Sequence, residues 1–200
     1  CLGVQLVSEA VDAATSMLII PNNSRTDDNG ISNTSMAVNK HRLVVVSALA
    51  NISATLKNYS QTTDKDLLCL SSVEMLLKTA IQACKDKSRI RPHGVRCLGS
   101  CIGWLRDVAF ESRNTAQKFV WDELNQELCN EALETLKECC YTEKNMKMRW
   151  NACHALGHLL HCPLPLNGSQ NWRKPVLEML CKLVSNFHNF KVRIQACGAL

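Results

Sequence analysis

The sequence predicts an all-α protein built of about four stacked helix pairs. Three observations lead to this fold class: apolar residues recur with helical spacing along most of the chain, one short stretch recurs at intervals of about fifty residues, and aromatic residues make up only 5%. Helices packed through Leu, Ala, Val and Cys need few aromatic side chains, whereas β-sandwiches favour them. A recurrence of this length indicates consecutive supersecondary units that each pack on their neighbours.

The recurring stretch is clearest near the carboxyl end, where KMRWNACHAL at 147 is nearly repeated by KVRIQACGAL at 191. RIRPHGVRCLG from Arg89 and KHRLVVVSALA from Lys40 are looser copies. In all four copies an arginine lies seven residues before a leucine, and the arginines are 49, 58 and 44 residues apart. They are Arg42, Arg91, Arg149 and Arg193. Each copy is expected to form the second helix, called B, of a pair.

The first pair is expected over residues 1–58. Its first helix, called A, is marked by the i, i+3, i+4 spacing from Val4 to Leu18. Residues 21–39 are polar and rich in turn-forming residues, which predicts an insertion before the second helix. Asn39 is the expected N-cap of that second helix.

The other pairs are expected over 64–111, 116–163 and 172–200, with a proline-punctuated linker at 163–171. Their A helices follow apolar patterns from Leu70 to Cys84, from Trp121 to Cys139 and from Val176 to Phe187. The expected N-caps of their B helices are Ser88, Asn145 and Asn189. Pro92 then falls in the first turn of its helix, where the missing N–H costs nothing.

The B-helix motif resembles the HEAT repeat. The residues that carry the resemblance are Ile90-Arg91, Met148-Arg149 and Val192-Arg193, each followed by a leucine seven residues after the arginine. Membership would imply a HEAT/armadillo-like α-solenoid, an α-α superhelix with A helices on the convex side and B helices lining a concave groove. It would also imply a binding protein, because no catalytic residue and no cofactor carries over from the family. The chain starts at Cys1 and stops within an apolar pattern, so a fragment of a longer solenoid is expected.

A group of Cys and His residues between 153 and 162 raises the question of a metal site. On a helical wheel, Met148, Ala152, Leu156 and Leu159 form the buried side, and His154, His158 and His161 lie roughly opposite. No ligand from a second element is identifiable, and the copy at 191 has no histidine, so no metal site is predicted. Groove-lining histidines are the preferred interpretation, with a labile metal site as the alternative.

The polar side of the B helices is the candidate protein-binding surface. Trp150 is its lead anchor, because an aromatic side chain beside amide and imidazole groups is typical of binding surfaces. The alternative is that Trp150 packs sideways on the neighbouring unit. The candidate protein-binding residues are Trp150, Asn151, His154, His158, His93, Arg96 and Gln195.

The recurring arginines have two interpretations. Each starts a helix close to a turn, where it could hydrogen-bond turn carbonyls or a carboxylate such as Asp86, and this structural role is preferred. The alternative is a basic ladder for phosphate. The net charge is only +5, and aromatic residues do not alternate with the basic ones, so nucleic-acid binding is not favoured.

Twelve cysteines are mostly placed in helical patterns, as small buried side chains. They therefore predict a reducing compartment, the cytosol or the nucleus. Cys139 and Cys140 are adjacent on a helix, so one thiol of the two is expected to be exposed. A redox role for that pair is the less favoured alternative. Cysteines in helical runs are expected to pack inside: Cys84, Cys97, Cys101, Cys129, Cys139, Cys153, Cys181 and Cys197.

No nucleophile motif, phosphate loop or zinc-protease motif is present in the sequence, and the longest weakly polar run is too short for a membrane span. The expected function is a non-enzymatic scaffold that binds other proteins along the B-helix groove. The alternative is nucleic-acid or transport-receptor-like binding through basic residues.

Overall fold

The computed structural model describes residues 2–18, 40–52, 54, 70–86, 90–112, 124–141, 144–162 and 172–200, and within them the chain forms helices and no strand. This confirms the all-α fold class. The expected insertion at 21–39 and the linker at 163–171 lie outside the described residues. No helix in the described ranges is both long enough and apolar enough to cross a membrane.

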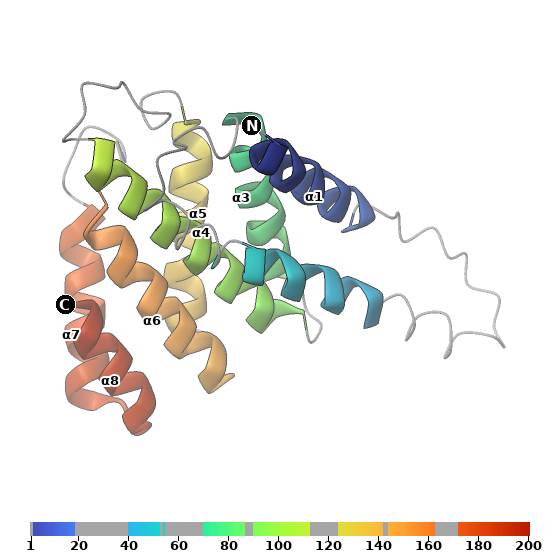
Figure 1. The fold of residues 1–200 in the computed structure, drawn as a ribbon. Helices are drawn as coiled ribbons and strands as arrows, with labels where there is room; N and C mark the ends of the chain where they lie inside the picture. Colours follow the sequence, from blue (N-terminus) through green and yellow to red (C-terminus); the bar gives the residue numbers. More distant parts are fainter. Residues whose placement is uncertain are drawn as a thin grey trace, which may run out of the picture.

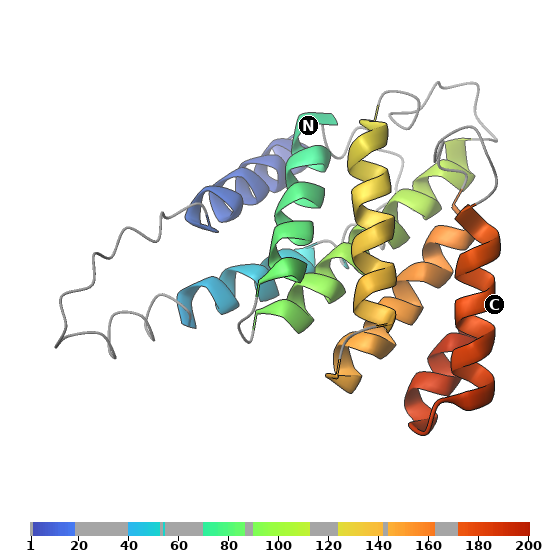
Figure 2. The same ribbon diagram turned by 180° about the vertical axis from the view of Figure 1, so that it is seen from behind.

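The A helices are α1 (Leu2–Leu18), α3 (Leu70–Lys85), α5 (Gln126–Tyr141) and α7 (Arg173–Asn186). Helices α3, α5 and α7 run side by side, and α1 lies behind them at an angle (Figure 2). Helix α1 packs on α3, and α3 packs on α5. We call these four helices the A layer.

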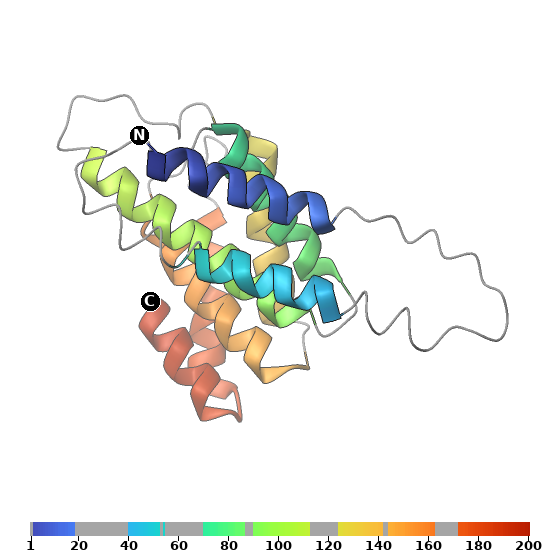
Figure 3. The ribbon, with the colours of Figure 1, turned by 45° about the vertical axis from the view of Figure 1, so that its right-hand side comes forward.

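The B helices form the second layer. They lie side by side in the order of the sequence, from one side of the molecule to the other (Figures 1 and 3). They are the helix over residues 40–52, α4 (Arg91–Ser112), α6 (Met146–Leu160) and α8 (Phe190–Ala199). Helix α4 packs on α6 and α6 on α8, while α3, α5 and α7 pack on α4, α6 and α8 respectively. We call this the B layer.

One extended apolar core runs between the two layers. On α6 the four residues expected on the buried side are all buried, and α8 buries the equivalent Val192 and Ala196. The alternation of buried and exposed residues therefore follows the recurring motif from one B helix to the next. The wheel that placed the histidines of α6 away from the core is confirmed.

Asparagines fix where two B helices start. The Oδ1 atom of Asn145 accepts hydrogen bonds from the backbone N–H groups of Lys147 and Met148, and Asn189 does the same for Lys191 and Val192. Both N-caps were predicted, as was the place of Pro92 in the first turn of α4. The expected caps Asn39 and Ser88 lie outside the described residues.

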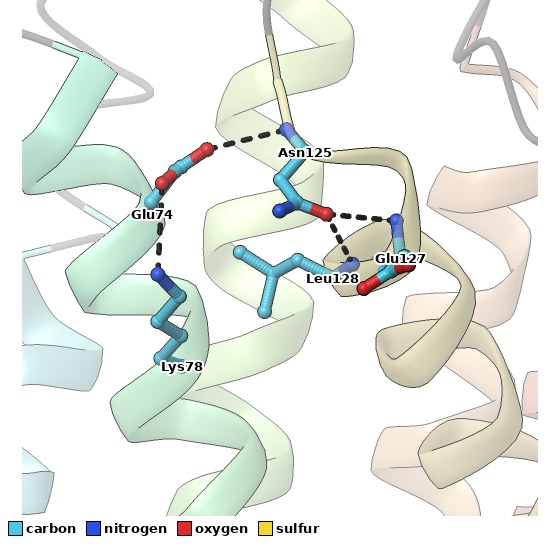
Figure 4. A network of polar contacts seen from close by, with 5 residues as sticks. All are labelled: Glu74, Lys78, Asn125, Glu127 and Leu128. Atoms are coloured by element: carbon cyan, nitrogen blue, oxygen red, sulfur yellow. Dashed lines mark hydrogen bonds and ion pairs between the residues drawn. The ribbon is translucent and has the colours of Figure 1, made fainter.

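The start of α5 differs from the prediction, because the apolar pattern placed Leu124 inside the helix. Asn125 instead caps α5, and its Oδ1 accepts from the N–H groups of Glu127 and Leu128 at 2.9 and 3.2 Å (Figure 4). The N–H of Asn125 donates to Glu74 of α3 at 3.2 Å, which ties the start of α5 to the neighbouring A helix. Leu124 is buried but precedes the helix.

The recurring arginines connect each B helix to the end of the A helix before it. Arg91 Nε donates to the Cys84 carbonyl at 2.7 Å, Arg149 Nη2 to Tyr141 at 3.2 Å, and Arg193 Nε to Val184 at 2.8 Å. These carbonyls lie where a helix ends and leaves its last acceptors unpaired. The structural role preferred for these arginines is thus confirmed in three units.

The same arginines also reach the following unit. Arg42 forms a 2.8 Å ion pair with Asp86, and Arg91 lies 3.8 Å from Glu138. The guanidinium of Arg149 lies over the ring of Phe187, 4.4 Å from its centroid. An arginine at one repeated position therefore holds two consecutive units together.

Small residues let the B helices approach one another closely. A Cβ on Gly99 would lie 3.0 Å from the Cβ of Ala155, and one on Gly157 would lie 2.9 Å from the Cα of Ala199. In both cases the glycine is eight residues after its arginine and the alanine is six residues after the next one. The packing of α4 on α6 is therefore repeated by α6 on α8.

Two predictions about cysteines were wrong. Cys139 and Cys140 are both buried, because α5 contacts α3 on one side and α6 on another. Cys181 and Cys197 were expected to be buried and are exposed. Cys197 occupies the position on α8 that Cys153 holds on α6, where Cys153 contacts Cys140 of α5.

Candidate functional site

The side of each B helix that faces away from the A layer carries a strip of exposed and half-buried side chains. Four positions on each B helix share this side: the residue two before the recurring arginine, and the residues two, five and nine after it. On a helical wheel with 100° per residue, these positions lie within about 60° of one another. We call these positions the outer strip. Its described members are Lys40, Val44, Ser47, Asn51, His93, Arg96, Ser100, Lys147, Asn151, His154, His158, Lys191, Gln195 and Gly198, and each is exposed or half-buried.

A depression of about 250 Å³ lies on this side, at the contact between α4 and α6. Its lining includes four of the predicted binding residues: Arg96, Asn151, His154 and His158. The other lining residues are Ala54, Val95, Gly99, Ser100 and Gly103. The structure therefore brings together side chains that are more than fifty residues apart in the sequence.

Polar contacts across neighbouring B helices hold part of the outer strip in place. His93 Nδ1 and Ser47 Oγ are 2.9 Å apart, and Arg96 Nη2 donates to Asn51 Oδ1. Burial lowers the pKa of His93, and the positive charges of Lys147 and Arg96 lower it further. His93 thus lies in a positive local field, and it is outside the lining of the depression.

His158 is oriented by its neighbours. Arg106 Nη1 lies 2.7 Å from His158 Nδ1, and since a guanidinium can only donate, Nδ1 is the acceptor. A neutral imidazole that accepts at Nδ1 carries its proton on Nε2. The His154 ring packs edge-on against His158, with centroids 4.4 Å apart. Arg106 was not among the predicted site residues.

Asn151 lies deeper than its neighbours on the strip. Its Oδ1 accepts from Trp150 Nε1 at 2.7 Å, whereas its buried Nδ2 has no hydrogen-bond partner within the described residues. A buried amide N–H₂ without an acceptor is unfavourable, by about 1–3 kcal/mol.

Trp150 and Gln195 do not line the depression. Trp150 is half-buried and packs against the core, and Lys191 Nζ from α8 lies 5.6 Å from its ring centroid. These contacts favour sideways packing on the neighbouring unit over an exposed anchor. Gln195 is half-buried on α8, at the position that Asn151 holds on α6.

Gly99 and Gly103 are lining residues that sequence reasoning missed. The signal was present, because they lie four residues apart on α4 and so face the same neighbour. A Cβ on Gly103 would lie 3.0 Å from Cδ2 of His158. The absence of side chains at these two positions creates the hollow, which a search for polar binding residues does not detect.

The Cys and His group of residues 153–162 is divided by the fold. Cys153 and Cys162 are buried, whereas His154 and His161 are exposed. Among the described residues, no three Cys, His, Asp or Glu side chains are arranged to hold a metal ion.

The buried thiols are paired with one another. Cys140 Sγ and Cys153 Sγ are 3.4 Å apart, and this hydrogen bond raises the pKa of Cys140 and lowers that of Cys153, while both residues are 0% exposed. The hydrogen bond with Cys139 likewise raises the pKa of Cys84, and burial raises the pKa of Cys129 to about 11. Thiols in such surroundings serve packing rather than attack on a substrate.

A second depression, of about 540 Å³, lies on the A layer between α5 and α7. Its charged side chains are engaged with one another: Lys85 contacts Glu131, Lys137 contacts Glu134, and Glu138 faces Arg91. The cations of the lining are thus taken up by carboxylates, and no row of cations faces this depression. The depression of the B layer is the better candidate.

Comparison with known proteins adds little to this geometry. No family model matches the chain. One solved structure that resembles it is an engineered protein of the Northeast Structural Genomics Consortium, with 11% sequence identity and a TM-score of 0.39 over 94% of this chain and 77% of that one. A likeness of this degree carries no argument about family or activity.

Proposed function

We propose that this chain is a HEAT-like α-solenoid that acts as a non-enzymatic scaffold and binds other proteins through the outer strip of its B layer. The resemblance of the B-helix motif to the HEAT repeat is one support. The other is that the arginine-to-carbonyl contact and the Gly–Ala contact recur from unit to unit. Repeated contacts of this kind are what stacked identical modules require.

The outer strip, with the depression at its centre, carries the proposal. Side chains that face the A layer are buried in the core, whereas those of the strip are exposed or half-buried. They still include Arg96, Asn151 and His154, which offer hydrogen bonds from a fixed helical frame. Rigidly held donors around a shallow hollow suit the docking of an extended polypeptide.

The cysteines support a reducing compartment for this scaffold. Most of the described ones are buried and used as small packing residues, and Cys140 and Cys153 lie next to each other as thiols. Such a core suits the cytosol or the nucleus, where thiols stay reduced.

The test is affinity capture from cell extract with quantitative mass spectrometry, using the wild-type chain and two double variants. Asn151→Ala with His154→Ala removes donors from the depression. Glu178→Ala with Lys182→Ala is the matched control, because both of its positions are exposed on α7 of the A layer. The expected result is a set of captured proteins that is lost with the first variant and kept with the second.

Circular dichroism must show the same helix content for both variants, so that loss of capture cannot come from unfolding. Identical capture by all three proteins would refute docking on the outer strip. If only the α7 variant loses the captured proteins, the binding surface lies on the A layer.

A further inference from the structure

Charge is distributed very unequally between the two layers. The A-layer helices carry acidic residues on every helix, including Glu9, Glu74, Glu131 and Glu178. The B-layer helices have only two acidic residues, Asp107 and Glu111. Their basic residues are Lys40, Arg42, Arg91, Arg96, Arg106, Lys147, Arg149, Lys191 and Arg193. Within the described residues, the B layer is therefore strongly basic.

The outer strip itself contains no carboxylate among its described members. Lys40, Lys147 and Lys191 are exposed and hold the same position, two residues before the recurring arginine. Arg96 is exposed on α4 between them. Each B helix thus contributes a cation to one row along the strip.

The positive charges of this row affect a neighbouring side chain, that of His93. The positive charges of Lys147 on α6 and Arg96 on α4 both lower the pKa of His93, although burial is the larger cause. Asp107, the B-layer carboxylate whose side chain the structure describes, is occupied by Arg106. The positive charge of the strip is therefore not neutralised by a carboxylate of its own helix layer.

We infer that the partner segment is acidic: an extended stretch of protein chain whose carboxylates meet the cation row. This inference rests on the proposed docking function. Two observations carry it: the row of Lys40, Arg96, Lys147 and Lys191, and the absence of carboxylates from the described members of the strip. Charge complementarity of this kind sets orientation and speeds association.

The spacing of the helices suits an extended chain. Packed helices lie about 8–10 Å apart, and an extended chain advances about 3.3 Å per residue. A carboxylate at every third residue would therefore meet successive B helices. A protein segment is favoured over nucleic acid because the described members of the strip offer cations but no Phe, Tyr or Trp side chain for base stacking.

The test is fluorescence anisotropy with three fluorescein-labelled probes. The first is a peptide with glutamate at every third position and alanine and serine between, the second has lysine in place of glutamate, and the third is an oligouridylate of equal length. The glutamate peptide is expected to bind and the lysine peptide to fail. The double variant Arg96→Glu with Lys147→Glu should lower the affinity for the glutamate peptide at least about tenfold.

The matched control is Lys174→Glu with Lys182→Glu, which makes the same change in net charge at exposed positions of α7 and should leave the affinity unchanged. The inference is overturned if both variants lower the affinity for the glutamate peptide equally, or if the wild-type chain does not bind this peptide. If the oligouridylate binds more tightly than the glutamate peptide, and its affinity falls steeply as salt is added, the inference is overturned in favour of nucleic acid.

The two proposals fail in different ways. If the glutamate peptide does not bind but the Asn151 and His154 variant still loses captured proteins, docking on the strip stands and the acidic chemistry is wrong. If that variant loses nothing, the docking function itself fails.

Discussion

At the scale of single residues, the recurring arginine is the clearest case of one side chain joining separate elements. Arg91 donates to the end of α3 and lies near Glu138 of α5, so it contacts its own unit and the next one. A hydrogen bond from a charged donor contributes about 1.5–3 kcal/mol, and less when it is partly exposed to water. The arginines therefore stabilise the joints between helices and leave the lysines of the strip available for a partner.

Replacing Arg91 tests this assignment. Arg91→Met keeps the apolar stem but leaves the Cys84 carbonyl without its charged donor, so we expect a loss of about 1–2 kcal/mol in the free energy of unfolding. Urea denaturation followed by circular dichroism measures it. Arg96→Met is the control, with an effect within about 0.5 kcal/mol, because Arg96 is exposed. An equal cost at both positions would contradict a special role for the recurring arginine.

At the scale of helices, close approach depends on positions without side chains. A Cβ on Gly94 of α4 would lie 2.6 Å from the carbonyl carbon of Ala83 and 2.7 Å from the backbone nitrogen of Cys84, both on α3. Backbone atoms cannot move aside as the end of a flexible side chain can. The contact between α3 and α4 therefore requires glycine at this position.

Two glycine-to-alanine substitutions should have opposite effects. Gly94→Ala forces α3 and α4 apart, and overpacking of this kind costs about 1–3 kcal/mol, which exceeds the gain in helix propensity. Gly198→Ala meets open space on α8 and should stabilise the protein by a few tenths to about 1 kcal/mol. Thermal unfolding compares the two. A stabilising Gly94→Ala would show that the helices are not in such close contact.

The sequence was most informative where a pattern repeats. The Arg-to-Leu motif gave the register of the B helices, the caps Asn145 and Asn189, and the buried side of α6, because local spacing determines all three. It failed for Cys139 and Cys140, whose burial depends on two neighbouring helices. It also missed the hollow at Gly99 and Gly103, which exists only once α4 lies on α6.

At the scale of the whole molecule, the two layers differ in chemistry as well as in position. The A layer balances its charges within itself, as the contacts of Lys85 and Lys137 with glutamates illustrate. The B layer combines a basic strip with a depression that holds Arg96, Asn151 and His154. The four predicted residues that line this depression lie close together because α4 and α6 are packed side by side and carry the recurring motif at the same position. Trp150, the predicted lead anchor, is half-buried against the core, and Lys191 of α8 lies over its ring.

Site-specific photocrosslinking tests most directly whether the outer strip is the surface that touches a partner. A photoreactive amino acid would be placed at position 154 on α6, or at position 178 on α7 as the control, since both side chains are exposed. The account predicts a discrete protein adduct from position 154 that is absent from position 178. Adducts from position 178 alone, or the same adducts from both positions, would contradict it.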